Sequence, residues 1–214
     1  MNNENLLNDI QTDILKEIFN ISVGKAAGVL SEIVNKKVLL NIPNIAWRSS
    51  SIQEITIEDY IPEQISGALM VSSIEFQEEI KGKANLIFSA DKMKKFIKLC
   101  LNEDENEMEI QDFTDIDFDI IKEIGNIILN CILGETGNYL NLKFSYSLPE
   151  VKIFDRVDLG KDIHERGYSH LLILQITFIL DDTEIEGAII IDLTIRSLNE
   201  IISMINGIEA NLNG

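Results

Sequence analysis

Apolar residues recur every three or four positions in two stretches of the chain. They are Leu7, Ile10, Ile14, Ile18 and Ile21 in the first stretch, and Phe113, Ile116, Ile120, Ile124 and Ile127 in the second. This spacing predicts two helices that each bury one face. We expect the first helix to continue past Gly24 to about residue 34, with a bend near residues 22–24.

Alternating apolar and polar positions predict strands after each of these helices. A short strand is expected to end at Pro43 in the first half and at Pro149 in the second, because proline cannot donate a hydrogen bond to a sheet. Longer strands are predicted at residues 66–73, 79–89, 169–180 and 184–193, with a tight turn at Asp181–Asp182. Amphipathic helices are predicted near residues 91–101 and 196–208. The pattern indicates an α+β fold in which helices cover a sheet of the antiparallel type.

The two halves of the chain are copies of one unit. Residues 13–21 match residues 119–127 at seven of nine positions, at an offset of 106 residues, and the match continues without a gap to Pro43 and Pro149. Such repetition indicates a duplicated fold. We therefore predict one domain, residues 1–214, made of two repeats at about 7–102 and 113–210 with a pseudo-two-fold relation and about six strands. An acidic connector, residues 103–117, separates the repeats.

The composition is that of a globular protein with a strongly acidic surface. Hydrophobic residues make up 45% and charged residues 25% of the 214 positions, and 36 Asp and Glu against 18 Lys and Arg give a net charge of −18. Such a charge repels nucleic acid and anionic membranes, and it favours a partner protein that presents basic groups. No apolar run approaches the roughly 20 residues of a membrane span, and the amino terminus does not read as a signal peptide, so we expect a cytoplasmic protein.

The chain has too few cysteine and histidine residues to suggest a disulfide framework or a metal centre. Cys100 and Cys131 are the two cysteines, and we expect both to be reduced. His164 and His170 have no cluster of further ligands beside them, so no metal site is expected.

Three polar residues recur at the same positions of both predicted helices. Asp13, Glu17 and Asn20 share one side of the first helix, next to its apolar face, and Asp119, Glu123 and Asn126 repeat the arrangement in the second. On spacing alone, a solvated helix face explains such residues more simply than a site does. Their recurrence in both copies nevertheless makes them the candidate functional residues.

The residue types limit the chemistry that these triads could perform. No Ser, Cys or His partner recurs beside them, which disfavours catalysis by a Ser–His or Cys–His pair. Two carboxylates one turn apart on a single helix would not face each other across a sugar, as a glycosidase requires. An amide and a carboxylate can orient a water molecule and engage a cation, which suits a chain that completes another protein's phosphoryl-transfer site.

The pattern Asp-x3-Glu-x2-Asn-x22-Pro occurs twice with full spacing. Its residues are Asp13, Glu17, Asn20 and Pro43, then Asp119, Glu123, Asn126 and Pro149. With this pattern the chain resembles the CheC-type chemotaxis phosphatases (the CheC/CheX/FliY family) over essentially its whole length. The two copies make it most similar to the two-site CheC proteins.

The resemblance implies a phosphatase that acts on a phosphorylated CheY-type response regulator. It implies that Asn20 and Asn126 orient the attacking water, that Glu17 and Glu123 contact a lysine of the regulator, and that Asp13 and Asp119 support the helix or the docking surface. The resemblance further implies that Mg²⁺ belongs to the regulator, that this chain binds no cofactor of its own, and that a CheD-like deamidase is a second partner to consider. Because the duplication places both sites in one chain, we expect a monomer.

The first site departs from the family pattern. Phe19 stands where the family commonly has glycine, and we expect it to narrow access to Asn20 or to change which regulator fits, whereas the second site keeps Gly125 beside Asn126. Two alternatives to the phosphatase stay open. One is a non-enzymatic adaptor that docks a regulator or a CheD-like protein, and the other is an acid/base hydrolase of small substrates.

Overall fold

The computed structural model describes residues 7–49, 61–62, 65–101, 113–168, 170–180 and 183–212. Within them the helices are α1 (Asp9–Val34), α2 (Ala90–Leu101), α3 (Asp115–Leu140), α4 (Arg156–Glu165) and α5 (Ile195–Leu212). The strands are β1 (Val38–Ser49), β2 (Leu69–Glu78), β3 (Gly82–Ser89), β4 (Phe144–Tyr146), β5 (Glu150–Phe154), β6 (His170–Leu180) and β7 (Thr183–Leu193). Most of the acidic connector and the turn at Asp181–Asp182 lie outside the described residues.

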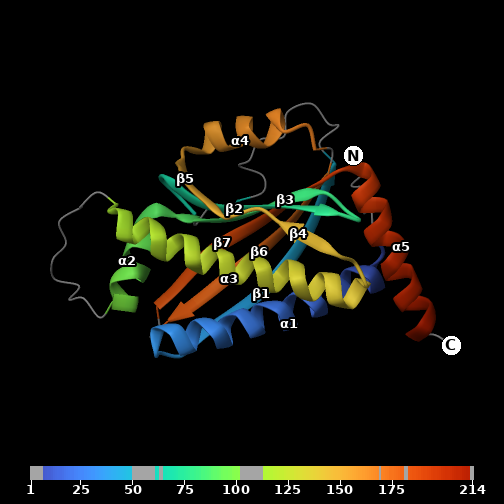
Figure 1. The fold of residues 1–214 in the computed structure, drawn as a ribbon, viewed down its shortest axis with the longest axis horizontal. Coiled ribbons are helices and arrows are strands. Elements are labelled where there is room, and N and C mark those ends of the chain that lie inside the picture. The colour runs from blue at the N-terminus through green and yellow to red at the C-terminus, as the bar shows by residue number, and fades with distance from the viewer. Residues whose placement is uncertain are drawn as a thin grey trace.

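All seven of these strands join one sheet, and every pairing is antiparallel (Figure 1). The order is β1-β6-β7-β3-β2-β4, with β5 also paired to β2. The third strands of the two repeats, β3 and β7, therefore pair at the centre. The first strand of each repeat pairs with the second strand of the other. This order confirms the predicted α+β fold, and it shows that the two repeats interleave.

The two long helices are built alike. Each has 26 residues, each begins at a capping box, and each ends at an asparagine in the left-handed conformation, Asn35 in α1 and Asn141 in α3. Asparagine tolerates this conformation, which satisfies the carbonyl groups at a helix end. α1 is helical without interruption through residues 22–24, where the sequence suggests a bend.

The expectation that the first strand ends at Pro43 is wrong. β1 continues to Ser49 through an irregularity at which two residues, Ile42 and Pro43, oppose the single residue Ile176 of β6. Such a bulge leaves one residue without a ladder bond, and this is where a sheet tolerates proline. The second repeat has the same feature between β4 and β5, which are one strand interrupted at Pro149; counting them together gives the predicted six strands.

The sheet separates two apolar cores. On one face, α1, α2, α3 and α5 cover a core that includes Ile74 of β2, Leu86 of β3 and Ile189 of β7. On the other face, α4 covers a smaller core that includes Val71 and Ile190. Neighbouring positions of β2, β3 and β7 alternate between the two cores because successive side chains of a strand point to opposite faces. The sequence reading missed α4, in which only Leu159 and Ile163 are buried.

The buried face of the long helices overlaps the predicted one in part. α1 buries Leu15, Phe19 and Val23, whereas Ile10 is 49% exposed and its counterpart Ile116 in α3 is 66% exposed. Leu7, Ile18 and Ile124 of the predicted apolar face are buried, so that face overlaps the buried one, and its remaining positions form the margin. Among the described helices, none is both long and apolar enough to cross a membrane.

Gly82 is predicted to be essential for stability because β3 meets β7 there without room for a side chain. An added Cβ would lie 2.5 Å from the ring of Phe76 and closer still to the carbonyl oxygen of Asp192. Gly82→Ala should lower the free energy of unfolding by at least about 2 kcal/mol in urea titration. Gly28→Ala is the matched control, because a Cβ there meets nothing within 4 Å and alanine favours the helix. Equal stability of the two variants would contradict the prediction.

Candidate functional site

The first triad lies on the amino-terminal half of α1. The helix begins at Asn8, whose side chain accepts a hydrogen bond from the backbone N–H of Gln11 (2.8 Å), while the Gln11 side chain accepts one from Asn8 N–H (2.8 Å). This reciprocal cap fixes the start of the helix and thereby the direction of its faces. Asp13 and Glu17 are exposed one turn apart, and Asn20 is half-buried.

A strand holds the amide of Asn20. The backbone N–H of Ile42 donates a hydrogen bond of 3.1 Å to Asn20 Oδ1. Ile42 is the first residue of the β1 bulge, so the irregularity that accommodates Pro43 also directs a backbone N–H toward α1. In the first repeat, this contact connects the Asn and the Pro of the sequence pattern.

The second triad lies on the amino-terminal half of α3. The cap here is Thr114 with Asp117, and Lys94 of α2 forms an ion pair of 2.5 Å with the Asp117 carboxylate. Asp119 and Glu123 are exposed and Asn126 is half-buried, as in the first repeat. Asn126 Oδ1 accepts a hydrogen bond of 2.7 Å from Nδ2 of Asn130, one turn further along the same helix.

The structure keeps the two triads apart. α1 and α3 lie side by side on the same face of the sheet and run in opposite directions, as the colours of Figure 1 show. Their carboxyl-terminal halves meet where Lys25 donates a hydrogen bond of 2.5 Å to Glu135. Each triad lies on one side of its helix as the sequence predicts, but the two sit toward opposite ends of the helix pair and form two separate candidate sites.

Each triad is bordered by exposed or half-buried isoleucine side chains. They are Ile10, Ile14 and Ile21 in the first repeat, and Ile116, Ile120 and Ile127 in the second. An apolar margin beside carboxylates that project into solvent is suited to contact with another protein. Within each triad, exposed carboxylates on one helix offer no facing pair of the kind that an acid/base hydrolase of small substrates would need.

The expectation that Phe19 narrows access to Asn20 is wrong. Phe19 is 1% exposed and belongs to the main apolar core, so it lies under the helix and not beside the triad. Its counterpart Gly125 also faces the sheet, but it packs there without a side chain. An added Cβ at Gly125 would lie 2.5 Å from Cβ of Ser72 in β2, so α3 approaches the sheet more closely than a side chain at this position would allow.

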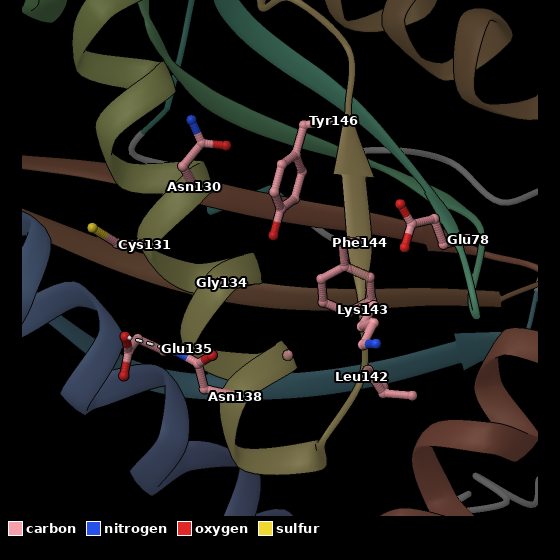
Figure 2. Close-up of a pocket in the computed structure, with 11 residues that line it drawn as sticks. Glu78, Asn130, Cys131, Gly134, Glu135, Asn138, Leu142, Lys143, Phe144 and Tyr146 are labelled. Atoms are coloured by element: carbon pink, nitrogen blue, oxygen red, sulfur yellow. Dashed lines mark hydrogen bonds between the residues drawn. The ribbon is translucent and has the colours of Figure 1, made fainter.

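A pocket of about 610 Å³ opens between the carboxyl-terminal half of α3 and β4, and its lining begins at Asn130, one turn beyond Asn126. Figure 2 shows Asn130 and Cys131 on the α3 side, Phe144 and Tyr146 on the β4 side, and Glu78 at the end of β2. Burial raises the pKa of the Cys131 thiol and of the Tyr146 hydroxyl. Burial therefore favours the neutral thiol and the neutral phenol in this pocket.

A buried charged network lies on the other face of the sheet. Arg166, just after α4, donates hydrogen bonds to Asp192 Oδ2 (2.8 Å) and Asn85 Oδ1 (3.1 Å), and it pairs with Asp162. Asp192 is 0% exposed, and burial raises its pKa to about 6 although Arg166 and Asn85 act in the opposite direction. Because α4 and the triads cover opposite faces, we interpret this network as an anchor for α4.

Sequence reasoning missed three of these elements. For Asn130 the sequence did contain a signal, because asparagine stands where the first repeat has Gly24. The Ile42 backbone donor and the Arg166–Asp192 pair had no signal in the sequence, because each depends on which segments the sheet places together.

Comparison with known proteins confirms the resemblance that the sequence pattern indicates. No protein-family model matches the chain. The CheY-P phosphatase CheC of Bacillus subtilis (strain 168) is 22% identical over 152 residues, which cover 70% of this chain and 69% of CheC. The crystal structure of Thermotoga maritima FliY matches with a TM-score of 0.72 at 16% identity, over 94% of this chain and 98% of that one. FliM in the FliG–FliM complex from H. pylori matches with a TM-score of 0.64 at 10% identity, over 92% and 100%.

The buried carboxyl of Asp192 is predicted to make stability depend on pH. Its pKa of about 6 in the folded protein lies above the unfolded value of roughly 3.9, so its protonated form stabilises the fold below about pH 4 and this contribution is lost as the pH rises through 6. The free energy of unfolding of the wild type relative to Asp192→Asn should fall by about 2–3 kcal/mol between pH 4 and pH 7. The exposed Glu184→Gln serves as control, and a difference that stays constant with pH would refute the prediction.

Proposed function

We propose that this chain is a phosphatase that removes the phosphoryl group from the aspartate of a phosphorylated CheY-type response regulator. One observation carries the proposal. In both repeats the structure presents two exposed carboxylates beside a half-buried asparagine whose amide oxygen is anchored by a hydrogen bond. The sequence likeness to the CheY-P phosphatase CheC supports the same substrate class.

The proposed reaction is hydrolysis of an acyl phosphate. A water oxygen forms a bond to phosphorus, the bond from phosphorus to the aspartyl oxygen breaks, and the products are inorganic phosphate, a free aspartate and a proton released to solvent. Asn20 or Asn126 would hold the water in line, since an amide can both donate to the water oxygen and accept from its hydrogen. Positioning of this kind supplies much of the catalysis in phosphoryl transfer.

Docking would use the surface around each triad. Glu17 or Glu123 would pair with a lysine of the regulator, and the isoleucine margin would bury apolar surface of the partner. The net charge of −18 favours a partner face that presents basic groups. Mg²⁺ is assigned to the regulator and not to this chain. Since both sites belong to one chain, a monomer suffices for the proposed activity.

A non-enzymatic adaptor is the second candidate. It is favoured by the fold likeness to FliM, which the solved structure shows in a complex with FliG. An adaptor would use the same exposed carboxylates and isoleucines to bind a regulator or a CheD-like deamidase, but it would need neither asparagine. The asparagines therefore separate the two candidates.

The double variant Asn20→Ala/Asn126→Ala is predicted to abolish the acceleration of phosphate loss while binding to the regulator is retained. Removal of both amides leaves no group to position the water, and a loss of about 100-fold or more is expected from such a deletion. The measurement is phosphate release from a phosphorylated CheY-type regulator with Mg²⁺. Asn199→Ala, at an exposed position of α5, is the control. Full activity of the double variant would establish the adaptor instead.

Each single variant, Asn20→Ala or Asn126→Ala, is predicted to keep a substantial share of the activity, because the two triads are separate and each has its own anchored amide. The rate constants that remain in the two single variants should sum approximately to that of the wild type. A single variant as inactive as the double one would show that only one triad works.

A further inference from the structure

The two candidate asparagines are held by different donors. In the first repeat the donor to Asn20 is the backbone N–H of Ile42, at 3.1 Å. In the second repeat the donor to Asn126 is the side-chain amide of Asn130, at 2.7 Å. The first repeat has Gly24 at the position of Asn130, so it has no side chain that could take the same part.

The difference originates in the strand that carries each proline. Ile42 and its counterpart Leu148 occupy equivalent positions in the bulges of the two repeats. However, Ile42 is 1% exposed and Leu148 is 83% exposed. In β1 the bulge faces the core beneath α1 and brings its N–H to Asn20. In the second repeat Leu148 stands in solvent between β4 and β5, and the amide oxygen of Asn126 is bonded within its own helix instead.

We propose that Asn130 is a positioning residue for Asn126, an inference that rests on the proposed function. Asn130 would replace the backbone donor that the first site takes from β1. The terminal torsion of asparagine is broad and roughly two-fold, so an unrestrained amide exchanges the places of its oxygen and its nitrogen. A donor to Oδ1 selects one of these orientations and directs Nδ2 of Asn126 the other way. The second site therefore depends on residue 130, and the first does not.

The surroundings of Asn130 hold it in this role. Its side chain lies in the wall of the pocket, on the side that faces Tyr146 (Figure 2). Its Nδ2 is committed to Asn126, and its Oδ1 is buried without a hydrogen-bond partner in the described structure. A buried acceptor without a donor costs free energy, so the amide of Asn130 is a poor choice for packing alone. Its replacement by an apolar side chain of similar size is therefore expected to leave the protein folded.

The test uses a background in which only the second triad can act. In the Asn20→Ala protein, Asn130→Leu should lower kcat about tenfold with little change in KM, because the docking residues stay in place while the amide that orients the water is released. Asn130→Gln keeps a donor at the same helical spacing and should restore much of the rate. Asn138→Leu, at an exposed position of the same helix, is the matched control. In the Asn126→Ala background, the loss caused by Asn130→Leu should be absent.

A second readout does not require activity. The side-chain amide resonances of Asn126 in ¹⁵N-labelled protein, identified by their loss in Asn126→Ala, should move toward the positions of free asparagine in Asn130→Leu and stay in place in Asn130→Gln. These resonances could shift while neither the wild type nor any variant releases phosphate. That outcome would support the positioning role of Asn130 and contradict the proposed phosphatase activity. Unchanged resonances, or a kcat that is insensitive to Asn130→Leu while the wild type is active, would overturn the positioning role itself.

Discussion

The pairing of β3 with β7 is the constraint on which the rest of this structure depends. These third strands of the two repeats run antiparallel from Gly82↔Leu193 to Phe88↔Gly187, and each glycine leaves room for a phenylalanine ring, Phe76 at Gly82 and Phe88 at Gly187. The symmetric ladder relates the long helices and the first two strands of one repeat to those of the other. The first strand of each repeat crosses to the second strand of the other, and α1 and α3 come to lie antiparallel. The separation of the two triads follows from this arrangement.

The strand bulge connects the fold to the candidate chemistry. A proline within a strand costs a ladder bond, and the sheet accommodates this by placing two residues opposite one. In β1 the same irregularity frees the N–H of Ile42 to hold Asn20. In the second repeat the bulge is kept but its leading residue is turned to solvent, and a side chain within α3 holds Asn126. Duplication thus preserved the anchored amide while changing the group that anchors it.

The two faces of the sheet differ in what covers them. The face under α4 is packed by a smaller apolar core and by the buried Arg166–Asp192 pair. The opposite face carries α1 and α3, whose outer sides present carboxylates beside exposed isoleucines. A strongly acidic protein with such a surface is suited to recognise another protein, whether it acts on that protein or only binds it.

The sequence by itself determined the duplication, the α+β fold, the long helices and the composition of both triads, because helical spacing and a near-identical nine-residue segment are local properties of the chain. It also showed asparagine at position 130 where the first repeat has glycine. Only the tertiary structure decided that β1 passes through Pro43, that Phe19 is buried beneath its helix, and that α4 covers the second face. The physical reason is the same in each case. Strand partners and the rotation of a helix on a sheet depend on contacts between segments more than 20 residues apart, such as Asn20 with Ile42 and Arg166 with Asp192.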